Sequence, residues 1–154
     1  MTKIISIANQ KGGVGKTTTA INLATAMVAI QKKVLLVDAD PQGNASTGLG
    51  INEDSRTPSL YELLSKQQLD IKAIKKTLIP GLDIITSTLD LAASEIELAE
   101  MQNRENIIKN ILMDIKGYDF IFIDCPPALG LLTINSLVAS KSVLVPLQCE
   151  YFAL

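Results

Sequence analysis

The sequence predicts an α/β fold with a mainly parallel sheet flanked by helices. Short runs rich in Val, Ile, Leu and Phe alternate with segments whose apolar residues have helical spacing, as in repeated strand–helix units. The runs are apolar throughout, which is typical of parallel strands covered on both faces. A chain of 154 residues suits one domain, and residues 1–154 are predicted to form it.

The elements follow in order along the chain. Five strands are predicted at residues 3–8, 34–38, 82–86, 120–124 and 142–147. Helical segments are predicted at residues 16–30, 57–64, 91–115 and 131–139, the third with an interruption near Gln102. Thr57 and Pro58 are interpreted as the cap and first residue of the second helix. Residues 40–50 are predicted to form a loop, and residues 150–154 to begin a further helix.

Composition excludes several classes of protein. Hydrophobic residues make up 47% of the chain, which excludes disordered and collagen-like proteins. A net charge of -2 gives no bulk basic character that would indicate a nucleic-acid-binding protein. There is no histidine, and Cys125 and Cys149 form no paired motif, so a zinc site or histidine-based catalysis is not expected. This cysteine usage is typical of a reducing cytoplasm.

Residues 9–18, Asn-Gln-Lys-Gly-Gly-Val-Gly-Lys-Thr-Thr, give the strongest signal for function. They follow a predicted strand and open a predicted helix, which is the context of a phosphate-binding loop. Gly12, Gly13 and Gly15 allow backbone amides to approach a phosphate, and the helix N-terminus adds partial positive charge. We expect Lys16 to reach the β- and γ-phosphates, Thr17 to ligate Mg²⁺ and Thr18 to donate to the α-phosphate.

The loop departs from the standard phosphate-loop pattern at two places. Gln10 stands where the pattern has glycine, and Lys11 adds a second lysine near the phosphates. We expect Lys11 to supply positive charge to the γ-phosphate, either in its own subunit or across a dimer.

Three aspartates lie at or just past the ends of predicted strands, at the sheet edge where open α/β folds bind ligands. Asp124 ends the apolar run Phe120–Asp124, which has the form of a Walker B strand, and is expected to hold Mg²⁺ through water. Asp38 and Asp40 follow the second strand. One of them is expected to support the metal ion and the other to orient the attacking water.

Three separated motifs carry a family resemblance. Residues 11–18 resemble the deviant Walker A motif of the ParA/Soj and MinD ATPases. Residues 38–44, Asp-Ala-Asp-Pro-Gln-Gly-Asn, and residues 124–130, Asp-Cys-Pro-Pro-Ala-Leu-Gly, resemble the ParA forms of switch I and of Walker B with switch II. The chain is therefore identified as similar to ParA/Soj partitioning ATPases over essentially its whole length.

This resemblance implies an ATPase that acts in chromosome or plasmid partitioning and is cytoplasmic and nucleoid-associated in bacteria. It implies ATP and Mg²⁺ as cofactors, an ATP-dependent sandwich dimer, non-specific DNA binding and stimulation by a ParB-type partner, with no membrane partner. Carried over by motif, Lys11 reaches the partner's nucleotide, Lys16 is the phosphate-loop lysine and Asp40 positions water. The phosphate cradle is then residues 12–18, including Val14, and Thr17, Asp38 and Asp124 serve the metal.

The family continues for about a hundred residues past residue 154, on its typical domain size. That part supplies the adenine-recognising loop and much of the DNA-binding surface, so the chain is expected to be C-terminally truncated and weak in hydrolysis. The alternatives are a membrane-cycling ATPase of the MinD type, an iron–sulfur carrier on the same fold, and a fragment with little nucleotide binding. The first needs a terminal amphipathic helix and the second needs paired cysteine ligands, and neither is visible in the sequence.

Overall fold

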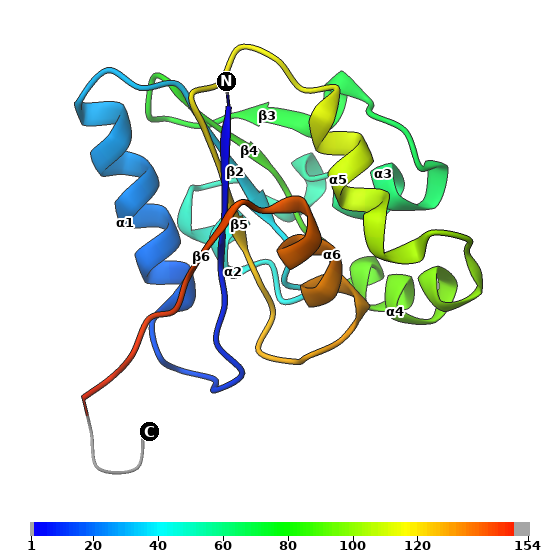
Figure 1. Ribbon diagram of the computed structural model, residues 1–154. Coiled ribbons are helices and arrows are strands. Elements are labelled where there is room, and N and C mark those ends of the chain that lie inside the picture. Colours follow the sequence, from blue (N-terminus) through cyan, green and yellow to red (C-terminus); the bar gives the residue numbers. More distant parts are fainter. Residues whose placement is uncertain (1, 150–154) are drawn as a thin grey trace.

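The computed structural model describes residues 2–149 as one sheet with helices on both faces (Figure 1). The strand order is β3-β4-β2-β5-β1-β6, and every pairing is parallel except β3 with β4. The strands are β1 (Lys3–Ile7), β2 (Val34–Asp38), β3 (Ile74–Lys76), β4 (Leu82–Ile85), β5 (Phe120–Asp124) and β6 (Ser142–Leu144). The predicted helical turn at 150–154 lies outside the described residues.

The α-helices of the described chain are unequal in length. They are α1 (Lys16–Ala29), α2 (Asn44–Gly48), α3 (Leu60–Lys66), α4 (Ser94–Glu97), α5 (Ile107–Met113) and α6 (Leu131–Ala139). In Figure 1, α1 covers one face of the sheet, while α3, α5 and α6 cover the other. Short 3₁₀ turns join several of them, at Glu53–Ser55, Ile71–Ala73, Leu89–Ala93, Leu98–Glu100 and Arg104–Asn106.

The central strand β2 shows why the sequence forms this sandwich. Leu35 and Val37 are fully buried in the core shared with α3, α5 and α6, whereas Leu36 is fully buried in the core on the α1 side. Alternate residues of a strand point to opposite faces, so an uninterrupted apolar run fits a strand covered on both sides. The prediction of a mainly parallel sheet flanked by helices is confirmed.

Between β2 and β3, two predicted local structures were wrong in detail. The segment 40–50, predicted as a loop, contains the five-residue helix α2, which begins after Gly43 in the left-handed conformation (φ 65°). The predicted helix 57–64 begins instead at Leu60 and ends at Lys66. Its cap is Ser59, whose Oγ accepts a hydrogen bond from Tyr61 N while Glu62 accepts one from Ser59 N. This capping box satisfies two free amides, which Thr57 does not do.

The predicted helix 91–115 is interrupted, as expected, near Gln102. The part before the break is a series of single turns centred on α4, and the part after it is α5. The apolar face after the break is buried in the structure and comprises Ile107, Ile108, Ile111, Leu112 and Ile115. These residues pack against the sheet, so tertiary packing rather than helix length stabilises the segment.

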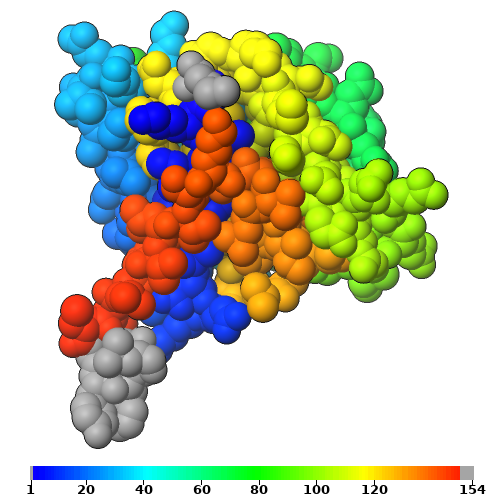
Figure 2. Space-filling model, viewed as in Figure 1, coloured from blue at the N-terminus to red at the C-terminus, as the bar shows by residue number. Residues whose placement is uncertain are grey.

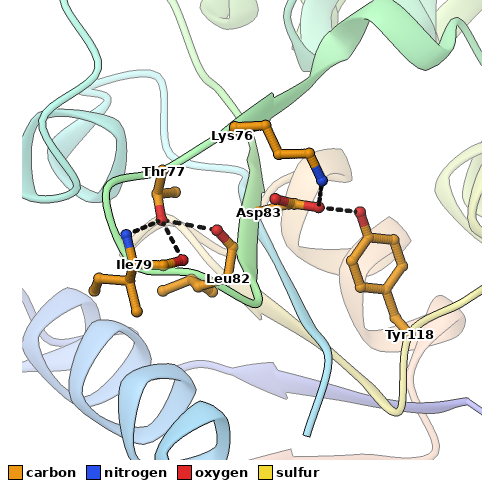
Figure 3. Close-up of polar contacts among 6 residues, drawn as sticks. All are labelled: Lys76, Thr77, Ile79, Leu82, Asp83 and Tyr118. Atoms are coloured by element: carbon orange, nitrogen blue, oxygen red, sulfur yellow. Dashed lines mark hydrogen bonds and ion pairs between the residues drawn. The ribbon is translucent and has the colours of Figure 1, made fainter. Parts of the chain in front are cut away.

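The short edge strand β3 was not predicted from the sequence. Its pairing with β4 is fixed by polar contacts (Figure 3): Lys76 Nζ lies 2.7 Å from Asp83 Oδ2, and Tyr118 Oη donates to the same oxygen at 2.6 Å. Thr77 Oγ1 donates to Leu82 O at 2.7 Å across the turn. Lysine on an edge strand also discourages pairing with another chain.

Strand β6 is shorter than predicted and ends at Leu144 rather than Leu147. Pro146 has no amide proton to continue the ladder. Residues 142–149 lie on the surface of the molecule and project past the rest of the described chain (Figure 2, orange to red). Asn9 Nδ2 donates to Pro146 O at 2.9 Å, and Gln148 Nε2 donates to Gly13 O at 3.1 Å, so this segment contacts residues 9–18.

Candidate functional site

The segment between β1 and α1 forms an open backbone cradle at the carboxyl edge of the sheet. Gly13 (φ 72°) and Gly15 (φ 84°) are in the left-handed region, which glycine adopts without strain. A Cβ built on Gly12, Gly13 or Gly15 meets no heavy atom within 4 Å, so open space adjoins the loop at each of these glycines. Gly15 caps α1 without a side-chain hydrogen bond, and no acidic residue lies in the first turn. The positive end of α1 therefore faces this space.

Lys16 and Thr17 open α1 and point their polar groups back toward the loop and the sheet. Lys16 is buried, and its Nζ donates to Lys11 O at 3.0 Å, which holds the ammonium group inside the loop. Thr17 Oγ1 donates to Asp124 Oδ2 at 2.7 Å, although the two residues are 107 positions apart in sequence. The phosphate-loop segment and the end of β5 are thereby joined as the sequence predicts.

Asp124 is a buried carboxylate that has one oxygen without a hydrogen-bond partner in the part of the chain that the structure describes. It ends β5, and the sheet register places it opposite Asp38 at the end of β2. Among residues 2–149, its Oδ1 has no hydrogen-bond partner, while Oδ2 accepts from Thr17. Burial, together with the nearby charges of Asp38 and Asp40, raises the pKa of Asp124 to about 7, and the hydrogen bond from Thr17 opposes this rise. A buried acid with a free oxygen beside a threonine hydroxyl fits the oxygen ligands that Mg²⁺ prefers.

Asp38 is held by α2 rather than by the loop cradle. Its Oδ2 accepts hydrogen bonds from Ser46 N at 2.8 Å and Ser46 Oγ at 2.7 Å, and its Oδ1 accepts from Asp40 N at 3.3 Å. Burial raises the pKa of Asp38 to about 6, and the two bonds from Ser46 oppose that rise. Both oxygens of Asp38 therefore already accept hydrogen bonds. Asp38 can fix the end of β2 and can place a negative charge opposite Asp124.

Asp40 lies where the chain leaves β2 and is half-buried. Its Oδ1 accepts from Gln42 N at 3.0 Å, so the carboxylate also shapes the following turn. It borders an open groove of about 430 Å³ that contains most of the predicted site residues. The groove is lined by Gly12, Gly13, Gly15, Lys16, Thr17, Thr18, Asp40, Gln42, Asn44 and Pro127.

The remaining predicted residues lie at the rim or behind the cradle. Lys11 is exposed, and its backbone N donates to Asn9 Oδ1 at 2.9 Å, which fixes the loop entrance. Val14 is buried, so it offers the cradle its backbone rather than its side chain. Cys125 is a small buried residue, and burial raises the pKa of its thiol to about 11, which does not suit a nucleophile.

Two residues that matter for this geometry were missed by sequence reasoning. Ser46 is fully buried and bonds Asp38, and its Oγ also accepts from Ser87 N at 3.0 Å. Arg56 is buried and donates to Thr47 Oγ1 at 2.7 Å and to Ile51 O at 3.2 Å. A Cβ on Gly43 would lie 2.5 Å from Arg56 Nη1, so glycine is needed there. No spacing rule marks these residues, because their partners are distant in sequence or are backbone atoms.

A phosphate-loop cradle after β1, a buried lysine and threonine opening α1, and an aspartate at the end of β5 define a P-loop nucleotide-binding fold. Residues 2–154 match the family described as AAA domain (AAA_31), and the chain belongs to that family.

Known relatives agree with this assignment. The chain is 54% identical to the sporulation initiation inhibitor protein Soj of Bacillus subtilis, covering 100% of this chain and 61% of Soj. It is 50% identical to the chromosome partitioning protein ParA of Caulobacter vibrioides, covering 99% of this chain and 58% of that protein. The chain thus spans about three fifths of the length of these relatives. The resemblance to ParA/Soj proteins is confirmed.

A solved structure shows the same fold with a ligand. The cobyrinic acid a,c-diamide synthase of Mycobacterium smegmatis, with a bound ATP analogue and magnesium, superimposes with a TM-score of 0.95 at 40% identity. The match covers 100% of this chain and 63% of that chain. Within residues 2–149, no helix has the length and apolar character needed to cross a membrane.

Proposed function

We propose that this chain is the nucleotide-binding part of a partition ATPase that acts in chromosome or plasmid segregation. The observation that carries the proposal is the open glycine cradle beside Lys16 and Thr17, with Thr17 bonded to Asp124, whose Oδ1 has no hydrogen-bond partner among residues 2–149. Relatives called Soj and ParA support the partitioning role, and a neighbour solved with an ATP analogue and magnesium supports ATP and Mg²⁺ as cofactors.

The phosphate tail of ATP would lie in the cradle, against the backbone amides of residues 12–18. The ammonium group of Lys16 already lies inside the loop, where it donates to Lys11 O. On nucleotide binding, Lys16 would exchange this bond for bonds to phosphate oxygens. Thr18 is exposed and lines the groove, and its hydroxyl would donate to the α-phosphate.

Mg²⁺ would be held by Thr17 Oγ1 and by Asp124, directly or through water, with Asp38 as support behind them. When bound, the ion neutralises charge on the phosphates and on the buried acids. Asp40 would orient the attacking water, because it is half-buried and lines the same groove as Lys16 and Thr17. Each of these roles uses a residue that the fold brings to one edge of the sheet.

Lys11 would act in trans. Its exposed position at the loop entrance suits a residue that reaches the nucleotide of a second copy in an ATP-dependent sandwich dimer. A cation supplied across such an interface can raise phosphoryl transfer by ~10³–10⁵, which would make hydrolysis depend on dimerisation. We further propose non-specific DNA binding by the dimer and stimulation of hydrolysis by a ParB-type partner.

The proposal is tested by phosphate release from Mg-ATP with and without added DNA, together with gel filtration in the presence of ATP. We expect slow hydrolysis that needs Mg²⁺ and a nucleotide-dependent shift to a dimer. Lys109→Ala serves as a control, because it removes an exposed lysine on α5, away from the residues lining the groove. This variant should behave like the wild type in both assays. A protein that binds no nucleotide while remaining folded would contradict the proposal.

A further inference from the structure

The N-terminus of α6 is capped by a carboxylate from a distant part of the chain. Leu131 N donates to Glu95 Oε2 at 2.7 Å, and Leu132 N donates to Glu95 Oε1 at 3.1 Å. Gly130, the residue at the cap position, makes no side-chain cap itself. A two-oxygen acceptor with negative charge satisfies two free amides and the positive end of the nine-residue helix together.

Gly130 leaves the space that Glu95 occupies. A Cβ at this position would lie 2.5 Å from Glu95 Oε1 and 2.7 Å from its Cδ and Oε2, so a larger residue displaces the carboxylate. The two residues therefore form one fitted contact, 35 positions apart in the sequence.

This contact fixes one end of the loop 125–130, which begins directly after Asp124. The other end is fixed at the sheet, where Cys125 N donates to Ile7 O at 3.1 Å. Thr133 Oγ1 in the first turn of α6 donates to Ala128 O at 2.6 Å, so the loop is also tied to the helix that Glu95 caps. Pro127 in this loop lines the groove that contains Lys16 and Asp40.

We propose that Glu95 is a positioning residue for ATP hydrolysis. By capping α6, Glu95 holds the loop 125–130 in its position beside the groove that contains Lys16 and Asp40. This inference rests on the proposed function. Glu95 touches neither nucleotide nor metal in this assignment and acts through Leu131 and Leu132. Its own segment is a series of single turns with exposed apolar residues, Leu89 at 73% and Ile96 at 74% exposed. Because Glu95 accepts hydrogen bonds from Leu131 and Leu132, a displacement of this segment would also displace the start of α6 and the loop before it.

The test compares Glu95→Ala and Glu95→Gln with Glu100→Gln, a matched control in the same segment with an exposed side chain. We expect Glu95→Ala to lower kcat about tenfold with KM changed less than about twofold, because misplacing catalytic groups costs rate more than ground-state binding. Glu95→Gln retains one acceptor and should lie between Glu95→Ala and the wild type. Glu100→Gln should match the wild type.

Amide hydrogen exchange gives a readout that does not need activity. Loss of the cap should speed exchange at Leu131 and Leu132 by roughly two- to thirtyfold, and the increase should extend to the non-proline amides of residues 125–130, including that of Cys125. Faster exchange confined to the first turn of α6, with kcat unchanged, would overturn the proposal. A folded wild-type protein that hydrolyses no ATP would instead refute the proposed function, and exchange in residues 125–130 would still decide whether Glu95 holds the loop.

Discussion

The substitution Asp124→Asn separates the stability of the site from its function. Asp124 is 1% exposed, and burial raises its pKa from 3.8 to about 7. The change keeps the shape of the side chain and removes its charge. We expect the variant to lose the effect of Mg²⁺ and yet to be more stable than the wild type at pH 8.

The expected magnitude follows from the pKa. A carboxyl group with a higher pKa in the folded state binds more protons there than in the unfolded chain, so stability falls as pH rises from about 4 to about 7. At about 1.4 kcal/mol per pH unit, the rise from 3.8 to about 7 corresponds to roughly 4 kcal/mol at pH 8. The amide nitrogen of asparagine takes the place of an oxygen without a partner among residues 2–149, at a cost of about 1–3 kcal/mol. The net gain at pH 8 is therefore about 1–3 kcal/mol.

Urea unfolding from pH 4 to pH 8, without nucleotide or Mg²⁺, measures this effect. The difference between Asp124→Asn and the wild type should grow with pH and should be absent or reversed at pH 4. Asp114→Asn, an exposed acid at the end of α5, is the matched control and should show no such trend. A stability difference that is the same at every pH, or a variant that is less stable at pH 8, would refute the reasoning.

Three other substitutions test different parts of the account. Ser46→Ala removes a donor to Asp38 and leaves Ser87 N without its acceptor, so the free energy of unfolding should fall by about 2–4 kcal/mol in urea titration; an unchanged midpoint would contradict this. Asp40→Ala should form ATP-dependent dimers on gel filtration without turning over, and phosphate release at the wild-type rate would remove Asp40 from the mechanism. Lys11→Ala should bind nucleotide as a monomer with normal affinity and lose dimer-linked hydrolysis, and a fully active monomer would exclude the role in trans.

The sequence predicted the parts of the fold that depend on local pattern. The buried run Val34–Asp38, the strand ending at Asp124 and the glycine-rich turn before Lys16 all carry signals within a few residues. The edge elements were missed or misplaced for a different reason. β3 is three residues long and is held by Lys76, Asp83 and Tyr118, whose contacts appear when the sheet has formed.

The same distinction holds for the candidate site. The residues that line the groove lie in three motifs, and the carboxyl ends of parallel strands bring those motifs together. The residues that hold the site in place were not predictable in this way. Ser46, Arg56 and Glu95 each bond backbone amides, carbonyls or hydroxyls of another segment, and such contacts leave no pattern in the sequence.

Nucleotide binding by the glycine cradle can be measured by calorimetric titration of a non-hydrolysable ATP analogue into the wild type and Lys16→Ala, each with and without Mg²⁺. We expect one saturable site per chain in the wild type, with tighter binding in the presence of Mg²⁺. A folded Lys16→Ala variant should show no measurable binding, because it lacks the ammonium group that Lys16 places inside the cradle. Equal affinity of the two proteins, or a wild type whose affinity does not depend on Mg²⁺, would contradict this expectation.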